Sequence, residues 1–331
     1  MARKPTAKET FVMFNVTYED GTMTSNRRVP ESILGGLEGD APAQALIARS
    51  RSSRAARAVR SSRLSARQRA EGKPGMSQAF LPTREQAFVR LKDFVPRAGS
   101  AYAKSRNFDY GPAERKNVSV LSPYLRHRLI GEDEVVRAVL SKHRISAADK
   151  FIQEVCWRTY WKGWLEQRPT VWTEYLSELS REQAKIEKYS DSAARYAAAV
   201  NGETGIAAFD AWSKELVETG YIHNHARMWF ASIWIFTLGL PWTLGADFFY
   251  RHLLDGDPAS NTLSWRWVAG LHTRGKHYVA RADNIRQYTE GRFDPSGELN
   301  ETPDPLDGPD NPPAVRLRAP MSVPPGEPVV L

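Results

Sequence analysis

The stretch LLDGDPASNTLSWRWV, residues 253–268, combines a short polar loop with two closely spaced tryptophans. Asp255, Asp257 and Asn261 supply the loop with carboxylate and amide oxygens, which accept hydrogen bonds from the N–H groups or hydroxyls of a ligand. The later ligand positions of an EF-hand are absent, so this is not a calcium loop. The stretch predicts a polar loop that offers hydrogen-bond acceptors.

The chain around this stretch, residues 76–292, has helical spacing of its apolar side chains. Residues 151–164 place aromatic and aliphatic side chains at the i, i+3, i+4 and i+7 positions of one helix face. Residues 210–217 repeat the pattern, and Gly and Pro separate the segments. All ten tryptophans lie between residues 157 and 267. We therefore expect a mainly α, multi-helical domain.

The first 75 residues differ from this domain. Residues 11–18, FVMFNVTY, are β-branched and aromatic and precede Glu-Asp-Gly, which indicates a possible β-hairpin. Residues 49–69 contain eight arginines and no acidic residue. Two interpretations of this Arg-rich linker stay open: a disordered or loosely helical connection, or a tail that binds nucleic acid.

The other end of the chain is dense in Pro, Gly, Asp and Glu and lacks periodicity. Such a composition indicates a disordered tail. The expected organisation is an N-terminal extension over residues 1–75, a helical domain over residues 76–292 and a tail over residues 293–331.

Composition limits the class of protein. The net charge of +8 on 331 residues points to an anionic partner such as nucleic acid. The single cysteine, Cys156, excludes a disulfide within the chain. We find no N-terminal secretory signal, and the longest apolar run, residues 228–242, is too short and too interrupted to span a bilayer. A cytoplasmic protein with no membrane partner is expected.

The common cofactor and nucleophile motifs are absent from the sequence. No G-x-G-x-x-G follows a strand, and there is neither a Walker A loop nor a G-x-S-x-G elbow. His223 and His225 are two residues apart, but no further ligand completes a metal set, so no metal is expected. A nucleotide cofactor would therefore be held by other devices.

Four short segments resemble, in order and spacing, the signature blocks of the FAD-binding domain of the DNA photolyase and cryptochrome family. They are LSPYL (121–125), FIQEVCWR (151–158), GYIHNHARM (220–228) and LDGDPASN (254–261). The resemblance implies a multi-helical fold that binds FAD. The α/β domain with which members of this family normally begin has no counterpart here, so no antenna chromophore is expected.

The resemblance also implies which residues contact FAD. Ser119 and Ser122 would offer hydroxyls and backbone N–H groups to the diphosphate, although VSVLS (118–122) has one hydroxyl fewer than the family's segment. Arg227 would lie near the flavin and pair with Asp255, and Asn261 would face flavin N5. The full expected set is Tyr102, Ser119, Val120, Leu121, Ser122, Asn224, Arg227, Asp255, Asp257 and Asn261.

A second set of residues matches the family's pocket for damaged DNA. Glu154 and Trp157 are one helical turn apart and share a face. The resemblance implies that this Glu hydrogen-bonds the base of a cyclobutane pyrimidine dimer and that this Trp stacks on it. Asn224 and Met228 stand where relatives that act on (6-4) adducts carry histidines, and Trp267 matches the second aromatic wall. The competing interpretation makes both tryptophans core residues.

Electron transfer and DNA contacts complete the implied site. The family relays electrons to excited flavin along three aromatic residues, and Trp265, Trp242 and Tyr189 match the inner, middle and outer positions. Positive charge around the pocket would contact DNA phosphates. The expected contacts are Arg106, Arg158, Lys162 and His225. The stretch AGLHTRGK (269–276) differs from the family and would reshape the rim of the pocket.

The function implied is light-driven repair of cyclobutane pyrimidine dimers, by electron transfer from excited, reduced FAD to a dimer flipped out of DNA. The retained pocket residues and Asn261 favour such a lyase. The alternative is a cryptochrome-like flavoprotein that senses blue light and repairs nothing, which the absence of the front domain favours. The sequence leaves the oligomeric state open.

Overall fold

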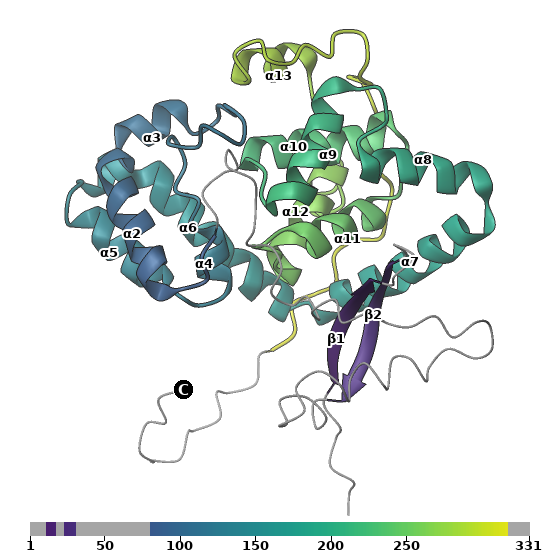
Figure 1. Ribbon diagram of the computed structural model, residues 1–331, viewed down its shortest axis with the longest axis horizontal. Helices are drawn as coiled ribbons and strands as arrows, with labels where there is room; N and C mark the ends of the chain where they lie inside the picture. Colours follow the sequence, from purple (N-terminus) through teal and green to yellow (C-terminus); the bar gives the residue numbers. More distant parts are fainter. Residues whose placement is uncertain (1–10, 18–22, 31–79, 317–331) are drawn as a thin grey trace, which may run out of the picture. The chain divides into compact units, whose positions relative to one another are not determined.

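The structure is a computed structural model that describes residues 11–17, 23–30 and 80–316. The chain divides into two compact units, Met1–Ala79 and Phe80–Leu331 (Figure 1). The Arg-rich linker, residues 49–69, lies outside the described residues.

The first unit contains a β-hairpin. Strands β1 (Phe11–Thr17) and β2 (Met23–Pro30) pair antiparallel, with a register shift between Phe14 and Val16. The β-branched and aromatic residues of residues 11–17 favour a pleated strand. The hairpin expected from the sequence is present.

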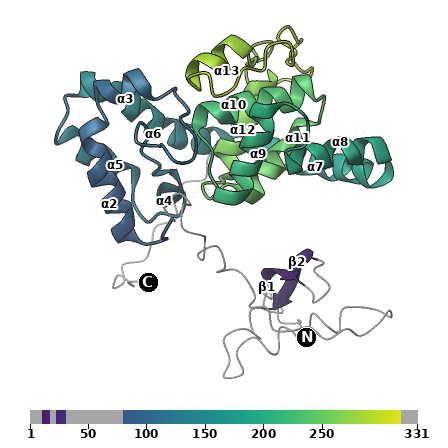
Figure 2. The same ribbon diagram turned by 45° about the horizontal axis from the view of Figure 1, so that its top comes forward.

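The helices of the second unit form two groups that lie side by side in both ribbon views (Figure 1 and Figure 2). The first lobe comprises α2 (Arg84–Phe94), η2 (Val95–Arg97), α3 (Ser100–Ser105), α4 (Ser122–Arg126), α5 (Glu132–Leu140) and α6 (Ile145–Glu166). The second lobe comprises α7 (Pro169–Lys188), α8 (Ser190–Asn201), α9 (Ala207–Thr219), α10 (Asn224–Ser232), η3 (Ile233–Thr237), α11 (Trp242–His252), α12 (Pro258–Ala269) and α13 (Ala282–Tyr288). The mainly helical fold expected from the sequence is confirmed.

Two helix ends bring distant segments of the second lobe together. Asp257 is the N-cap of α12, and its side chain accepts hydrogen bonds from the backbone N–H groups of Ala259 and Ser260. Gly220 is the C-cap of α9, and its φ of +68° is in the left-handed region that favours glycine. A Cβ at this position would lie 2.7 Å from the side chain of Leu254. The N–H of Leu254 donates to the carbonyl of Gly220 at 2.9 Å. The segments before α10 and before α12 therefore run next to each other.

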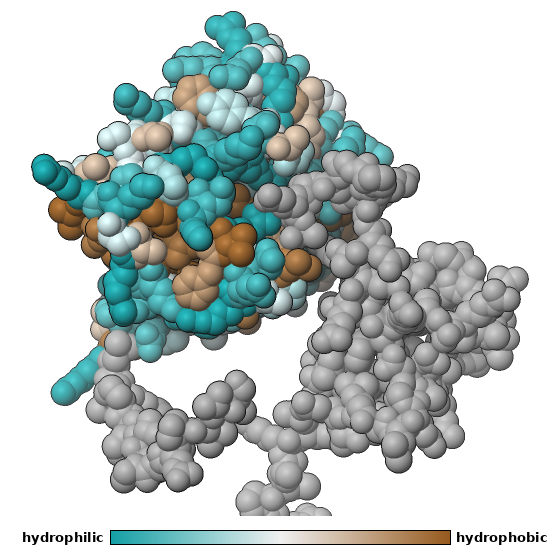
Figure 3. Space-filling model, turned by 60° about the vertical axis from the view of Figure 1, so that its left-hand side comes forward, coloured by the Kyte–Doolittle hydropathy of each residue, from teal (hydrophilic) through white to brown (hydrophobic). Residues whose placement is uncertain are grey.

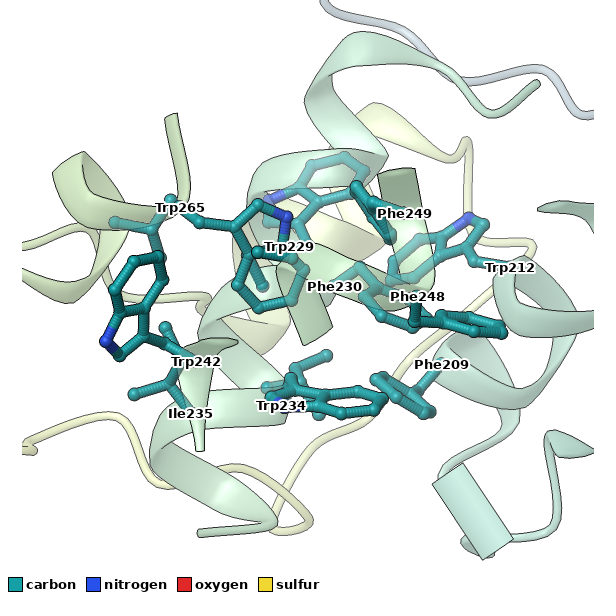
Figure 4. Packing of buried hydrophobic residues seen from close by; sticks show 14 of the residues in the cluster. Phe209, Trp212, Trp229, Phe230, Trp234, Ile235, Trp242, Phe248, Phe249 and Trp265 are labelled. Carbon is teal, nitrogen blue, oxygen red and sulfur yellow. The ribbon is translucent and has the colours of Figure 1, made fainter. Parts of the chain in front are cut away.

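Stacked aromatic rings form the core of the second lobe (Figure 4). The rings of Phe209 and Phe230 stack with centroids 4.2 Å apart, and Trp265 meets Phe249 edge-on at 5.1 Å. Each such pair contributes about 0.5–1.5 kcal/mol beyond the burial of its area. Because Trp265 belongs to α12 and Phe230 to α10, this core fixes both helices.

The first lobe has its own, smaller core and an apolar outer surface. Phe94 contacts the rings of Tyr102 and Phe151 at 5.8 and 5.0 Å. Figure 3 views the molecule from the side of this lobe and shows apolar side chains between charged ones. The exposed large apolar residues of α2, α5 and the start of α6 are Phe88, Val89, Leu140 and Ile145. None of the helices in the described part of the chain is long and apolar enough to span a membrane.

The loop between α3 and α4 is anchored on the second lobe by a buried carboxylate. Asp109 Oδ2 accepts hydrogen bonds from Trp212 Nε1 at 3.0 Å and from Arg292 Nη2 at 2.8 Å. His223 is buried nearby. Its Nδ1 accepts from the N–H of His225 at 3.1 Å, and its Nε2 has no hydrogen-bond partner among the described residues. Burial lowers the pKa of His223 to about 4, so the folded protein holds this ring neutral.

The C-terminal segment, residues 294–316, packs on the helical unit. The N–H of Leu306 donates to the carbonyl of Ala269 at 3.0 Å, and the N–H of Val315 donates to that of Gln167 at 2.8 Å. The expectation of a disordered tail is wrong over these residues. An extended chain that bonds singly to helix ends has no periodicity, so the sequence pattern could not reveal it. Residues 317–331 lie outside the described residues.

We expect Gly245→Ala to destabilise the fold. A Cβ at Gly245 would lie 2.3 Å from the ring of Trp265 and 2.9 Å from that of Trp234. Overpacking of this kind costs about 1–3 kcal/mol. Gly163→Ala is the matched control, because a Cβ inside α6 at Gly163 meets nothing within 4 Å and replacing a mid-helix Gly by Ala stabilises by about 0.5–1 kcal/mol. Chemical unfolding of both variants tests the pair, and equal effects would contradict the close approach of α11 and α12.

We expect His223→Asn to flatten the dependence of stability on pH. The unfolded chain protonates this histidine near 6.5 and the folded protein near 4. Between these values the unfolded state binds more protons, so unfolding free energy falls as pH falls, by about 1.4 kcal/mol per pKa unit of difference. Asn at this position keeps an N-capping side chain. Thermal unfolding from pH 7 to pH 4 measures the slope, and a His127→Gln variant serves as control. An unchanged slope in His223→Asn would show that His223 is not the group that titrates.

Candidate functional site

A cavity of about 830 Å³ lies between the two lobes. Pockets for organic ligands and cofactors commonly measure about 300–1,000 Å³. Helices α3, α4 and α6 line it from the first lobe, and α10, α12 and the loop before α12 line it from the second. Every residue expected to contact the cofactor or the damaged base lines this one cavity.

Asp255 forms the central ion pair of the cavity. Arg227 Nη1 and Nη2 donate to its two carboxylate oxygens at 3.1 and 3.0 Å, so the expected pair is present and is bidentate. Burial by itself would raise the pKa of Asp255. The charge of Arg227 and the hydrogen bonds from Arg227 and Ser122 outweigh burial and hold that pKa below its ordinary value. Asp255 is therefore a fixed negative acceptor.

Asp257 divides its two oxygens between two roles. Oδ1 caps α12, whereas Oδ2 faces three cations of the first lobe. Arg158 Nη2, Arg126 Nε and Lys162 Nζ lie 3.7, 3.8 and 3.9 Å from Oδ2. These distances are too long for hydrogen bonds. The side chain of Arg158 is only 11% exposed, yet its Nε and Nη2 have no hydrogen-bond partner within the described ranges.

The charge around Asp257 does not balance. Glu132 adds a second carboxylate, 3.7 Å from Arg158 Nε, and itself pairs with Arg128 at 2.5 Å. Four cations thus share two carboxylates, which leaves two positive charges in excess. Burial lowers the pKa of both Arg158 and Lys162, as expected for cations without full compensation. An anion with two charges, such as a diphosphate, would complete the cluster.

This cluster corrects one expectation for DNA contacts. Arg158 was expected at a DNA phosphate, but its side chain is 11% exposed, turns toward Asp257 and lines the cavity itself. Lys162 also faces Asp257 but keeps 30% of its side chain exposed, so its expected contact with a phosphate stays a prediction. Both residues follow Trp157 on α6, so the face on which they lie depends on where α6 packs. That position could not be inferred from the sequence.

The loop before α4 carries backbone strain. Val120 has a φ of +52°, in the left-handed region that β-branched residues avoid. Ser119 Oγ accepts a hydrogen bond from the N–H of Leu121 at 3.4 Å, and the whole loop lines the cavity. Strain of this kind persists where surrounding structure demands it and is concentrated at binding sites. Helix α4 has five residues, so the loop and not a long helix dipole would hold a phosphate.

The expected lesion-binding residues form another part of the same cavity. Glu154 Oε1 accepts from Arg106 Nη1 at 2.5 Å, so Arg106 orients Glu154, and its expected contact with a DNA phosphate stays a prediction. Trp157 is 48% exposed, which rules out the interpretation that it is a core residue. Asn224, Met228 and Trp267 line the cavity from α10 and α12.

His225 does not fit the expected contact with DNA. It is buried, its Nδ1 bonds the carbonyl of Asn107 at 2.9 Å and its Nε2 meets the hydroxyl of Tyr278 at 3.3 Å. Its ring stacks on Trp229 with centroids 4.0 Å apart. Burial also lowers its pKa, so a positive charge there is disfavoured. The expectation is wrong because the ring turns into the second lobe.

The three residues expected to relay electrons do not all lie close together. Trp265 lines the cavity and Trp242 is buried in the second lobe. Tyr189 is 53% exposed and follows the end of α7, whereas the ring that packs on Trp242 is that of Tyr175, at 5.6 Å. Tyr189 lies fourteen positions after Tyr175, which is roughly 21 Å of rise along α7. The expectation for Tyr189 is therefore wrong.

Several cavity residues were missed by the sequence analysis. Tyr160 and Trp161 line the cavity from α6, and Ser260 lines it from α12. The spacing of Tyr160 and Trp161 from Trp157 gave a signal for a shared face. His272 and Thr273 line the cavity from the turn after α12, and they belong to residues 269–276, which the sequence analysis expected at its rim.

The residues present fit FAD by the chemistry of their donors and acceptors. The excess positive charge near Asp257 suits a diphosphate, and the unpartnered Arg158 and Ser260 hydroxyl supply buried donors. Asn261 Nδ2 donates to the carbonyl of Ala246 at 2.7 Å, which leaves its amide oxygen to accept from a ring N–H. No cluster of potential metal ligands occurs within the described residues.

Comparison with known proteins agrees with this chemistry. Residues 151–301 match the family model described as the FAD binding domain of DNA photolyase. The deoxyribodipyrimidine photo-lyase of Synechococcus sp. is 32% identical over 195 residues, which are 57% of this chain and 39% of that protein. That of Alkalihalophilus pseudofirmus is 29% identical over 229 residues, 66% of this chain and 46% of that protein. The chain thus spans less than half the length of these curated relatives.

Solved structures give the same answer for the fold. A bacterial class III photolyase from Agrobacterium tumefaciens superposes with a TM-score of 0.51 and 28% identity, over 62% of this chain and 45% of that one. A cryptochrome from Synechocystis sp. superposes with a TM-score of 0.51 and 23% identity, over 65% of this chain and 45% of that one, and supports the fold alone. FAD, the cofactor expected from the sequence, is the one that the matched domain binds. Residues 151–301 therefore match the FAD-binding domain of DNA photolyase, and the helical unit shares its fold with a photolyase and a cryptochrome.

Proposed function

We propose that this protein is a light-driven DNA lyase that opens cyclobutane pyrimidine dimers with FAD bound between its lobes. The observation that carries the proposal is that Glu154, Trp157, Asn224, Met228 and Trp267 line the same cavity as the cofactor residues. Helices α6, α10 and α12 bring these five side chains together from three separate parts of the sequence. A lesion seated among them would lie next to the cofactor.

When bound and reduced, FAD supplies an electron to the dimer after absorbing light and recovers it once the cyclobutane ring has opened. The protein's own residues hold the base. Glu154 would hydrogen-bond a base N–H, and the ion pair with Arg106 fixes its orientation. The exposed ring of Trp157 would stack on one side of the dimer, and Trp267 would limit the other.

Flipping the dimer into the cavity is favoured by the lesion itself. A damaged pair is weakly stacked and weakly paired, so extruding it costs less than extruding a normal base. Asn224 lies exposed at the first position of α10 and Met228 follows one turn later. An amide and a flexible thioether accommodate the two rings of a dimer without presenting a charge.

Reduction of the cofactor would use the aromatic side chains behind the cavity. Trp265 and Trp242 stay the proposed inner and middle residues, and Tyr175 replaces Tyr189 as the outer one. Tyr175 packs on Trp242 at 5.6 Å and on Trp172 at 5.2 Å. Burial raises the pKa of Tyr175 above its ordinary range, so its hydroxyl stays protonated at neutral pH.

The test is a repair assay on the purified, photoreduced protein with an oligonucleotide that contains one cyclobutane thymine dimer. Loss of the dimer under blue light and not in darkness supports the lyase. A protein that retains reduced flavin but leaves the dimer intact would contradict it and favour a light-sensing flavoprotein.

Glu154→Ala should slow repair by roughly 10- to 100-fold, because one charge-assisted hydrogen bond contributes about 1.5–3 kcal/mol. The bound flavin, measured by absorbance, should stay unchanged, and Glu154→Gln should retain part of the activity. Loss of flavin in Glu154→Ala would mean that Glu154 belongs to the cofactor and not to the lesion.

The Arg-rich linker accounts for the excess charge of the protein. The chain has 46 basic and 38 acidic residues, and residues 49–69 contain eight arginines and no acid, so the remainder has 38 of each. Sequence-independent attraction to DNA phosphates would therefore come mainly from the linker and not from the helical unit.

Replacing the eight arginines of residues 49–69 by serine should weaken DNA binding and flatten its salt dependence. Each phosphate contact that is lost reduces the slope of log affinity against log salt by about 0.9 for duplex DNA. Dark binding to an undamaged duplex at several salt concentrations measures the slope. If the slope is unchanged, the helical unit supplies the phosphate contacts and the linker interpretation is wrong.

A further inference from the structure

A row of aromatic rings extends along α6 from the cavity toward its C-terminal end. Trp157, Tyr160, Trp161 and Trp164 occupy i, i+3, i+4 and i+7 positions and so share one face of the helix. The distance from the first to the last is roughly 10 Å of helix rise. Trp157, Tyr160 and Trp161 line the cavity, and the row continues beyond it to Trp164.

The rings of this row contact one another. Trp157 and Trp161 stack at 5.7 Å with an interplanar angle of 26°, and Tyr160 meets both edge-on at 5.3 and 5.2 Å. His272 then bridges Trp161 and Trp164, with centroids 4.9 and 4.7 Å away. These rings therefore form one continuous aromatic surface, which packs against the ring of His272.

Two of these rings stay half in solvent. Trp157 is 48% exposed and Tyr160 is 47% exposed, although both lie beside a cavity that could bury them. A bound lesion would cover the exposed part of the Trp157 ring. It would not cover the exposed part of the Tyr160 ring. Exposed aromatic patches of this kind mark interaction surfaces.

Cations accompany the row along its length. Lys162 lies on the same helix with 30% of its side chain exposed, and the guanidinium of Arg168 covers the ring of Trp164 at 4.5 Å. Aromatic rings combined with neighbouring positive charge are the means by which proteins bind single-stranded nucleic acid, since each base stacks on a ring and each phosphate meets a cation. Paired bases in a duplex are already stacked on one another and offer no free faces.

We propose that the surface formed by Trp157, Tyr160 and Trp161 binds unpaired nucleobases of single-stranded DNA next to the flipped lesion. This inference rests on the proposed function, because it takes the cavity as the place where a damaged base enters. It adds the substrate class: the strand that leads to the cavity is single-stranded, and the protein prefers it to a duplex.

The test is dark binding of an undamaged, labelled oligonucleotide of about 16 nucleotides, alone and paired with its complement. The full-length protein is used with its flavin, so that phosphate binding by residues 49–69 is the same in every variant. Tyr160→Ala removes the ring, Tyr160→Phe keeps it, and Tyr250→Ala removes another exposed tyrosine that does not line the cavity.

We expect wild-type protein to bind the single strand more tightly than the duplex. Tyr160→Ala should bind the single strand about 5- to 100-fold more weakly, the range for loss of one stacked base, and the duplex as before. Tyr160→Phe and Tyr250→Ala should match the wild type.

Equal affinity of wild-type protein for the two forms, or an unchanged single-strand affinity in Tyr160→Ala, would overturn the inference. Loss of flavin from Tyr160→Ala would overturn it too, because the ring would then serve the cofactor. Light-dependent repair is scored separately on the same preparations. Repair without a single-strand preference rejects this inference and leaves the lyase standing, whereas dark single-strand binding without repair rejects the lyase.

Discussion

The buried carboxylate of Asp257 is the constraint around which the two lobes are arranged. One oxygen of Asp257 caps the N-terminus of α12 in the second lobe, and the other faces Arg126, Arg158 and Lys162 of the first lobe. A buried carboxylate is tolerated when cations and hydrogen bonds compensate its charge. Here the cations exceed the carboxylates, so the same interaction that joins the lobes also prepares the cavity between them for an anionic ligand.

The lobes contribute to the site in different ways. The second lobe positions α10 and α12, and with them Arg227 and Trp265, through stacked rings such as Phe209 and Phe230. The first lobe supplies the surface of α6, on which the aromatic row and the cations lie on adjacent faces. In the proposed complex, this one long helix would turn one face to the cofactor and another to the DNA strand.

The sequence predicted much of this site in two ways. Helical spacing, which is a local signal, predicted the mainly α fold, and the resemblance to the family's signature blocks implied that Arg227 pairs with Asp255. The failures have a shared cause, which is that packing decides where a side chain turns. His225 looked like a free cation but stacks on Trp229, and Tyr189 looked like a neighbour of Trp242 but lies roughly 21 Å farther along α7 than Tyr175. The left-handed backbone of Val120 has no signature in the residue type at all.

The C-terminal segment, residues 294–316, is hydrogen-bonded to the turn that joins the two lobes. The lobes are joined in sequence at the turn between α6 and α7, and the segment returns to that turn: Val315 bonds Gln167, and Pro312 accepts from Arg168. A change in the angle between the lobes at that turn would therefore have to break these hydrogen bonds. Residues 294–316 contain no regular element, so a shortened protein could be designed to end after the last helix. Such a protein would lose these hydrogen bonds to the turn between the lobes, beside the cavity.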